Sequence, residues 1–72
     1  MQIIIHPNSS PEFSLEVQPT DNLQSVKEKI LAKLGTPLDK QRLLFQGTQL
    51  EVGRTIQDYR ITAGNTIVLI IG

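Results

Sequence analysis

One segment of the chain has the length and periodicity of an amphipathic helix, and it constrains the fold more than any other feature. Its apolar residues recur at spacings of three and four, at Leu23, Val26, Ile30 and Leu34. Such a stripe buries one side of a helix against another layer of structure. Asn22 stands in the N-cap position, and Gly35 is suited to the left-handed conformation that ends many helices. The spacing therefore predicts one helix over residues 23–34, lying on a sheet.

Beyond this helix the chain consists of short apolar or alternating segments that are typical of β-strands. The expected strands are residues 1–6, 12–17, 41–45, 48–50 and 66–71. The turn residues 7–11 join the first two, and Gln46-Gly47 joins the next two, so each pair is expected to form a hairpin. The last strand is apolar almost throughout, which favours a central position in the sheet. A capping-box pattern from Thr55 to Asp58 predicts a short helical turn before it.

The predicted order is strand, strand, helix, strand, strand, short helical turn, strand. This is an α+β arrangement, with one long helix packed across one face of a mixed five-strand sheet. The first and last strands are both apolar enough to be central. We therefore expect them to be parallel neighbours joined through the helix as a crossover, which makes the fold a β-grasp. At 72 residues the chain has room for one domain, residues 1–72.

Composition narrows the chemistry that such a domain can carry. The chain has no cysteine and one histidine, so it can form no disulfide or thiolate nucleophile, and we expect no metal site. Seven basic and seven acidic residues give a formal net charge of zero, which argues against binding to nucleic acid or to membranes. No signal-peptide pattern opens the chain, so we expect a cytoplasmic or nuclear location. We expect a monomer without a cofactor.

The residues that could support catalysis form no recognisable constellation. Ser9 and Ser10 belong to a turn and have no nearby pair of a histidine and an acid. His6 is expected at the exposed end of a strand, and the acidic residues are scattered singly. The sequence therefore predicts a binding domain and no enzyme.

Strand parity predicts a small apolar group on the side of the sheet that the helix leaves free. Within residues 41–45, Leu44 alternates with inward-facing apolar residues and points outward. Within residues 66–71, the same alternation places Val68 and Ile70 on the outer side. If these two strands are neighbours, the three aliphatic side chains meet in solvent.

Charged and mixed residues surround this expected apolar group. Lys40 and Arg42 form its rim, where they could meet acidic groups of a partner. Gln2 and Ile4, on the outer side of residues 1–6, form a secondary surface. Apolar patches rimmed by polar residues mark interaction sites, so we expect a surface that binds proteins.

A large set of residues stands at the spacings of the ubiquitin family, without a gap along the chain. The set is Leu15-Glu16-Val17, Pro19, Asp21, Val26-Lys27, Lys29-Ile30, Gly35, Pro37, Asp39, Gln41-Arg42-Leu43, Phe45, Gly47, Gln49-Leu50-Glu51, Gly53-Arg54-Thr55, Asp58-Tyr59, Ile61, Thr66 and Leu69. The chain therefore resembles the ubiquitin family. The resemblance implies the family's fold and an outer patch that small helical receptor domains bind. It also implies protein partners: ubiquitin-binding helical domains, proteasome receptors and, for a modifier, conjugation enzymes.

The chain departs from the family's pattern where that family is conjugated to lysines. The sequence ends at Ile71-Gly72, whereas the family continues into a mobile tail that ends in Gly-Gly. Four family lysines are replaced, by His6, Pro11, Thr48 and Ala63. Of the acceptor lysines that the resemblance implies, Lys27, Lys29 and Lys33 remain. These departures disfavour chain building of the ordinary kind.

Lys27 is similar to a family lysine that is largely buried and paired with an acid. The position of that acid holds Val52 here. Because a buried and unpaired ammonium group is costly, we expect either another acceptor or a side chain that reaches outward.

Three functions are compatible with these observations. The altered lysines and the absent Gly-Gly favour a non-conjugated ubiquitin-like domain of a larger protein. The start Met1-Gln2-Ile3 is also that of a ubiquitin-like modifier whose conjugating tail is missing from this sequence. A β-grasp with an unrelated role, or an enzyme, is disfavoured by the absence of catalytic groups.

Overall fold

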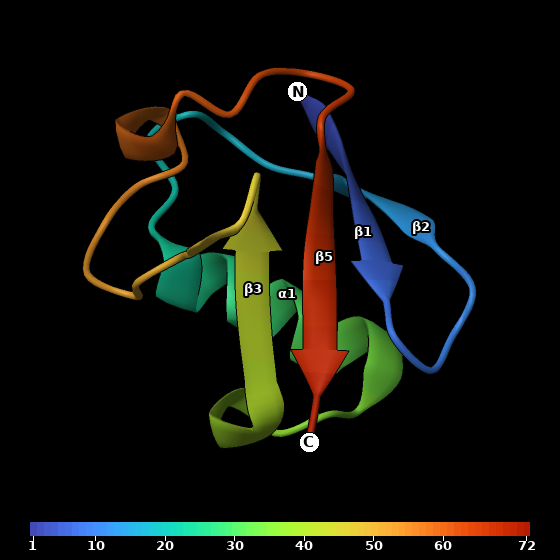
Figure 1. The fold of residues 1–72 in the computed structure, drawn as a ribbon. Coiled ribbons are helices and arrows are strands. Elements are labelled where there is room, and N and C mark those ends of the chain that lie inside the picture. Colours follow the sequence, from blue (N-terminus) through green and yellow to red (C-terminus); the bar gives the residue numbers. More distant parts are fainter.

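The sheet contains five strands in the order β2-β1-β5-β3-β4, in a computed structural model that describes residues 1–72 (Figure 1). The elements along the chain are β1 (Gln2–Pro7), β2 (Phe13–Glu16), α1 (Leu23–Leu34), η1 (Leu38–Lys40), β3 (Gln41–Phe45), β4 (Thr48–Gln49), η2 (Gln57–Tyr59) and β5 (Thr66–Ile71). The architecture is the predicted α+β β-grasp.

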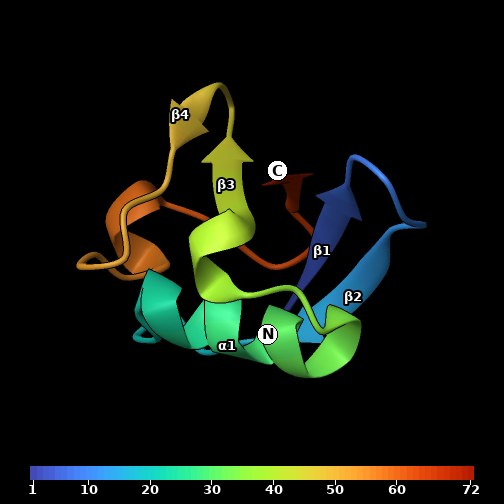
Figure 2. The ribbon, with the colours of Figure 1, turned by 90° about the horizontal axis from the view of Figure 1, so that it is seen from below.

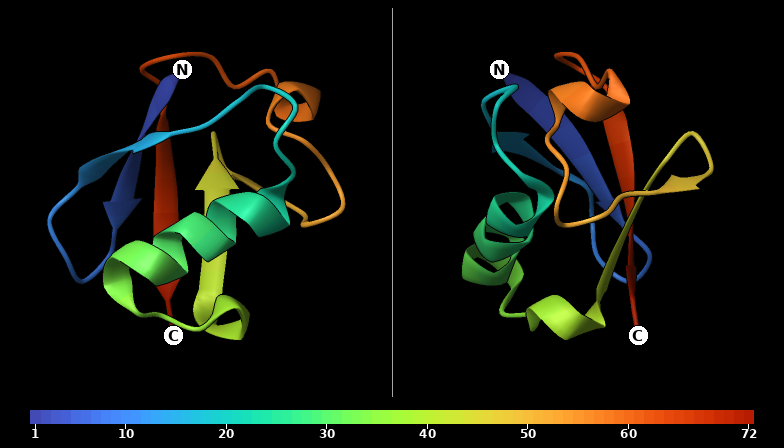
Figure 3. Two further views of the ribbon diagram at one scale, coloured as in Figure 1. Left: turned by 180° about the vertical axis from the view of Figure 1, so that it is seen from behind. Right: turned by 90° about the vertical axis from the view of Figure 1, so that its left-hand side faces the viewer.

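Strands β1 and β5 form the parallel pair at the centre of the sheet, as predicted. Ile4 lies opposite Thr66, and Ile5 lies opposite Ile67. Strand β2 pairs antiparallel with β1, and β3 pairs antiparallel with both β5 and β4. A parallel pair needs a crossover connection, and α1 supplies part of it while lying across one face of the sheet (Figure 2, Figure 3).

Helix α1 begins and ends at the residues that the sequence predicts. The side-chain oxygen of Asn22 accepts a hydrogen bond of 2.8 Å from the backbone N–H of Ser25. Gly35 adopts the left-handed conformation, with φ of 76°, and its N–H donates to Leu31 at 2.7 Å. These bonds satisfy backbone groups that the helix itself leaves free at its two ends.

The core lies between α1 and the inner face of the sheet. Leu23, Val26 and Ile30 of the helix are fully buried there. The sheet contributes fully buried residues from its three central strands, namely Ile3, Ile5, Leu43, Ile67 and Leu69. The burial of these alternate strand positions confirms the parity that the sequence predicts.

Several predicted boundaries are wrong by one or two residues. The first strand does not stop at His6, because Pro7 is its last residue: Pro7 is buried and lies opposite Leu69, and the next residue, Asn8, donates its N–H to Leu69 at 3.0 Å. A proline at the end of a strand leaves the ladder intact when its neighbour supplies the next donor. Strand β2 is shorter than the predicted 12–17, β4 stops before residue 50, and η1 was not predicted.

The predicted capping box, formed by Thr55 and Asp58, stands at the start of η2. The backbone N–H of Thr55 donates to the Asp58 carboxylate at 3.0 Å, and the Asp58 N–H donates to the Thr55 hydroxyl at 3.3 Å. The hydrogen bond from the Thr55 backbone N–H, followed by the Thr55 hydroxyl group near the carboxylate, lowers the pKa of Asp58 from its ordinary value. The predicted two-residue turn between β3 and β4 is also present, with positive φ at both Gln46 and Gly47.

Asp21 connects the segment after β2 to the helix. Its carboxylate accepts the N–H of Gln18 at 2.9 Å and the ammonium of Lys29 at 3.1 Å. The hydrogen bond from Gln18, followed by that from Lys29, lowers the pKa of Asp21 from its ordinary value of 3.8. Because the folded state favours the ionised form, this carboxylate stabilises the fold above about pH 4, and the contribution is lost as pH falls through the lowered pKa.

We therefore expect Asp21→Asn to lower the free energy of unfolding at pH 7, because the amide cannot pair electrostatically with Lys29. The difference from the parent protein should shrink as pH falls from 4 to 2, where the parent carboxylate is also neutral. Urea unfolding at several pH values measures both quantities. Asp39→Asn, at an exposed residue of η1, is the matched control. A difference that is constant from pH 7 to pH 2 would contradict the assigned role of the Asp21 charge.

Candidate functional site

The sheet face turned away from α1 carries three neighbouring aliphatic side chains, Leu44, Val68 and Ile70, which we call the outer patch. Leu44 of β3 lies directly opposite Val68 of β5, and Ile70 lies two residues further along β5. Val68 is 38% exposed, and the other two are half-buried. The viewer of Figure 1 faces this side of the sheet, with α1 behind it. The structure therefore brings the three predicted patch residues together.

The strand sequences explain why this face is apolar. Strand β5 reads Thr-Ile-Val-Leu-Ile-Ile, so that apolar residues occupy both of its faces. Ile67 and Leu69 point into the core, and the intervening residues must point the other way. No second layer covers them, because the single helix lies on the inner face (Figure 3). The outer patch thus contributes little to the core and remains available to another molecule.

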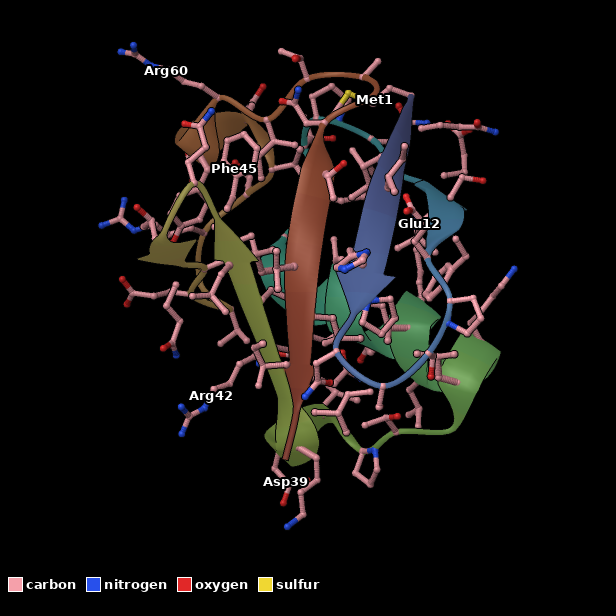
Figure 4. The ribbon with its side chains drawn as sticks, turned by 45° about the vertical axis from the view of Figure 1, so that its right-hand side comes forward. Met1, Glu12, Asp39, Arg42, Phe45 and Arg60 are labelled. Carbon is pink, nitrogen blue, oxygen red and sulfur yellow. The ribbon has the colours of Figure 1, made fainter.

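A basic border flanks the outer patch at the start of β3. Arg42 lies opposite Ile70 and points away from the sheet (Figure 4). Together with Lys40 it lines a concavity of about 220 Å³, whose remaining walls are Asp39, Ile70 and Gly72. The N–H of Gly72 donates to Lys40 at 3.1 Å, which holds this end of β5 against β3. The two cations can accept a carboxylate of a binding partner beside the apolar surface.

The opposite border was not predicted as part of the site. His6 of β1 lies directly opposite Val68, and its ring nitrogen Nδ1 is 3.9 Å from the Glu12 carboxylate. Asn8 accepts a hydrogen bond of 3.1 Å from the N–H of Ile71 through its side chain, so the loop after β1 is fixed beside Ile70. Only the strand register reveals that these polar residues of the turn region border the patch.

The secondary surface lies on the same face at the other end of β1. Ile4 is half-buried and lies opposite Thr66. On this face the pair is next to the pair of His6 and Val68. Gln2 is exposed and lies opposite Glu16, one row further away. Ile4 is therefore a diagonal neighbour of the outer patch, whereas Gln2 lies apart from it.

The three candidate acceptor lysines all lie on α1, away from the outer patch. Lys29 is held by Asp21 and by the carbonyl oxygen of Glu16 at 2.8 Å. The ammonium of Lys33 lies 5.4 Å from the centre of the Phe13 ring, a cation–π arrangement. Lys27 is half-buried and takes part in none of the ion pairs, so its ammonium group is neither fully buried nor paired with a replacement acid.

The polar side chains offer no clustered reactive groups. No group of three His, Asp or Glu side chains could hold a metal ion. None of the helices is long and apolar enough to cross a membrane. What the surface offers is a patch of aliphatic carbon between two polar borders, and this arrangement suits binding to another protein.

Comparisons with known proteins agree with the geometry. The model of the ubiquitin family matches residues 3–72. The chain is 31% identical to the ubiquitin-like protein NEDD8 of Dictyostelium discoideum over 71 residues, which cover 99% of the chain and 92% of that protein. It is 27% identical to ubiquitin-like protein 1 of Schizosaccharomyces pombe, with 99% and 91% covered. It is 31% identical to human ubiquitin-like protein 4A, of which it spans 45%.

The side chain of Asn8 accepts the hydrogen bond of Ile71, the last residue of β5. Asn8→Ala removes the acceptor of the Ile71 N–H, so this amide should exchange with solvent faster, by roughly ten-fold at most for one exposed hydrogen bond. The amides of the core strands should keep their protection. Hydrogen exchange followed by NMR measures this, with Ser9→Ala in the same loop as the control. Unchanged exchange at Ile71 would show that Asn8 does not hold the loop.

Proposed function

The chain belongs to the ubiquitin family, and from this membership and the outer patch we propose that it is a protein-interaction domain of the ubiquitin pathway. Its partner docks an apolar helix on Leu44, Val68 and Ile70, with Lys40 and Arg42 at the border. The observation that carries the proposal is that three aliphatic side chains share one uncovered face, in register on adjacent strands.

The size of the outer patch sets the expected affinity. Complete burial of one aliphatic side chain contributes about 1.5–3 kcal/mol, and the patch residues are already partly covered. Association itself costs several kcal/mol in lost translational and rotational freedom. A contact of three such residues with a charged border therefore favours micromolar dissociation constants. Such affinities suit a transient adaptor that releases its partners.

The partner class that we propose is a small helical ubiquitin-receptor domain or a proteasome receptor, in the cytoplasm or nucleus. A helix presents apolar residues on one side at the spacing of its turns and can lie on a flat apolar face. The relation to ubiquitin-like protein 4A supports a domain role, because the chain spans less than half of that protein.

A second candidate function is that of a ubiquitin-like protein modifier. It is favoured by the relation to the ubiquitin-like protein NEDD8 of Dictyostelium discoideum, 92% of which the chain covers. In that role the outer patch would still bind receptors, and conjugation enzymes would be additional partners. The two functions differ in whether a carboxyl end is activated, and that difference can be measured.

The docking proposal predicts that Leu44→Glu and Val68→Glu each abolish detectable binding to helical ubiquitin-receptor domains while the fold persists. A carboxylate on this face would have to lose its hydration in the complex, whereas in the free protein it stays in water. Titration calorimetry measures binding, and urea unfolding should show a midpoint close to that of the parent protein.

Leu31→Glu is the matched control for these variants. Leu31 is 38% exposed, as Val68 is, but it lies on α1 at the opposite side of the molecule. It should bind as the parent does. Normal binding by both Leu44→Glu and Val68→Glu would show that the outer patch is not the docking site, and unfolding of Leu44→Glu would show that Leu44 belongs to the core.

The adaptor role also predicts that the 72-residue chain forms no thioester with a ubiquitin-type activating enzyme and ATP. Activation needs a mobile carboxyl end, and the N–H of Gly72 is paired with Lys40. The chain should form no adduct that is sensitive to reducing agent. Gel electrophoresis with and without thiol measures this, with mature ubiquitin as the positive control. A thioester on this chain would establish the modifier function instead.

A further inference from the structure

The charged residues around the outer patch are segregated by sign. Glu12 stands at the β2 side of the sheet, whereas Lys40 and Arg42 stand at the start of β3, on the far side of the patch. Figure 4 shows Glu12 and Arg42 at opposite borders of this face. All three side chains belong to exposed residues.

The strand register gives the distance between the residues that carry these charges. Glu12 adjoins His6, and from His6 one row runs through Val68 to Leu44. The row spans three strand spacings of about 4.8 Å each, and Arg42 lies two residues further along β3, about 7 Å away. The backbone positions of Glu12 and Arg42 are therefore separated by about 16 Å along a diagonal that crosses the patch.

The other charged groups near the outer patch do not remove the opposite charges at its two borders. Glu16, the other carboxylate at the β2 side, is paired with the amino group of Met1 at 2.6 Å. Glu12 pairs with no lysine or arginine, and its one ion-pair contact is the His6 ring nitrogen Nδ1 at 3.9 Å. Of the side chains that line the concavity, those of Lys40 and Arg42 are positive and that of Asp39 is negative.

We propose that Glu12 and Arg42, with Lys40, form a charge axis that selects the direction in which a partner helix crosses the outer patch. The helix places an acidic residue over Arg42 and Lys40 and a basic residue over Glu12. This inference rests on the proposed docking function and adds to it the charge pattern of the partner and the role of Glu12.

The dimensions of an α-helix match this axis. At 1.5 Å per residue, about 16 Å corresponds to about 11 residues, which is three turns. Residues that far apart therefore lie on the same side of the helix. Apolar residues one and two turns from the acidic end would meet Ile70, Val68 and Leu44. Acidic residues are favoured in the first turn of a helix and basic residues in the last, so the N-terminal turn of the partner lies over Arg42.

Two synthetic helical peptides test the axis. Both carry the same apolar residues; one has Glu in its first turn and Lys 11 positions later, and the other has these two residues exchanged. Hydrocarbon cross-links on the solvent side keep both peptides equally helical. We expect the parent protein to bind the first peptide about five-fold to thirty-fold more tightly, the range for two exposed charge pairs changed from attraction to repulsion. The preference should fall in 0.5 M salt.

A charge-exchanged protein, Glu12→Lys with Lys40→Glu and Arg42→Glu, should reverse the preference between the two peptides. All three positions are exposed, so the fold is expected to persist, which circular dichroism checks. The control is Glu28→Lys with Lys33→Glu on α1, which also exchanges charges and should leave the preference unchanged.

The outcomes separate the axis from the docking function. Equal binding of both peptides to the parent protein, abolished by Leu44→Glu, would overturn the axis and keep the docking site. Absence of binding by either peptide would overturn both. Self-association of the parent in sedimentation, lost in Arg42→Glu and restored when Glu12→Lys is added, would assign the charges to a second copy of the chain and overturn the partner-helix proposal.

Discussion

The parallel pairing of β1 with β5 is the contact on which the rest of the structure depends. It joins the two ends of the chain, with Ile4 opposite Thr66. Strand β2 attaches to the β1 side of this pair, and β3, with β4 beyond it, attaches to the β5 side. Closing such a distant contact costs conformational entropy, and the burial of the inner residues of both strands offsets it. Ile3, Ile5, Ile67 and Leu69 are fully buried for this reason.

The same pairing also determines which face is left for binding. A parallel connection through α1 places the helix on one side of the sheet, and a chain of 72 residues has no second helix of that length for the other side. Folding therefore leaves the outer face of β5 uncovered. The burial of Ile67 and Leu69 accounts for two of the five apolar residues of β5. Val68 and Ile70 lie outside this core, and the docking function that we propose would account for their apolar character.

Much of this organisation could be predicted from the sequence, because its strongest signals are local or periodic. The bounds of α1 follow from its apolar spacing, from the Asn22 cap and from Gly35. The outward direction of Leu44 and Val68 follows from strand alternation once β3 and β5 are neighbours. These features need no knowledge of distant contacts beyond the order of the strands.

The features that the sequence did not predict depend on contacts between distant residues. Pro7 continues β1 because Asn8 supplies the next hydrogen bond to β5, some 60 positions away in the chain. Glu12 and His6 read as parts of a turn and a strand end, and only the register places them beside Val68. The half-buried position of Lys27 likewise depends on how the helix packs on the sheet.

Selectivity in this domain is therefore expected to lie at the borders of the outer patch. Three aliphatic side chains attract any helix with a suitable apolar side, because the hydrophobic effect has no direction. Charges at the border add little affinity, yet they penalise a partner that brings like charges together. Asn8 fixes the loop between β1 and Glu12 to β5, so the acidic border keeps its distance from the basic one. A fixed pair of opposite charges can discriminate between partners that the apolar surface alone would treat alike.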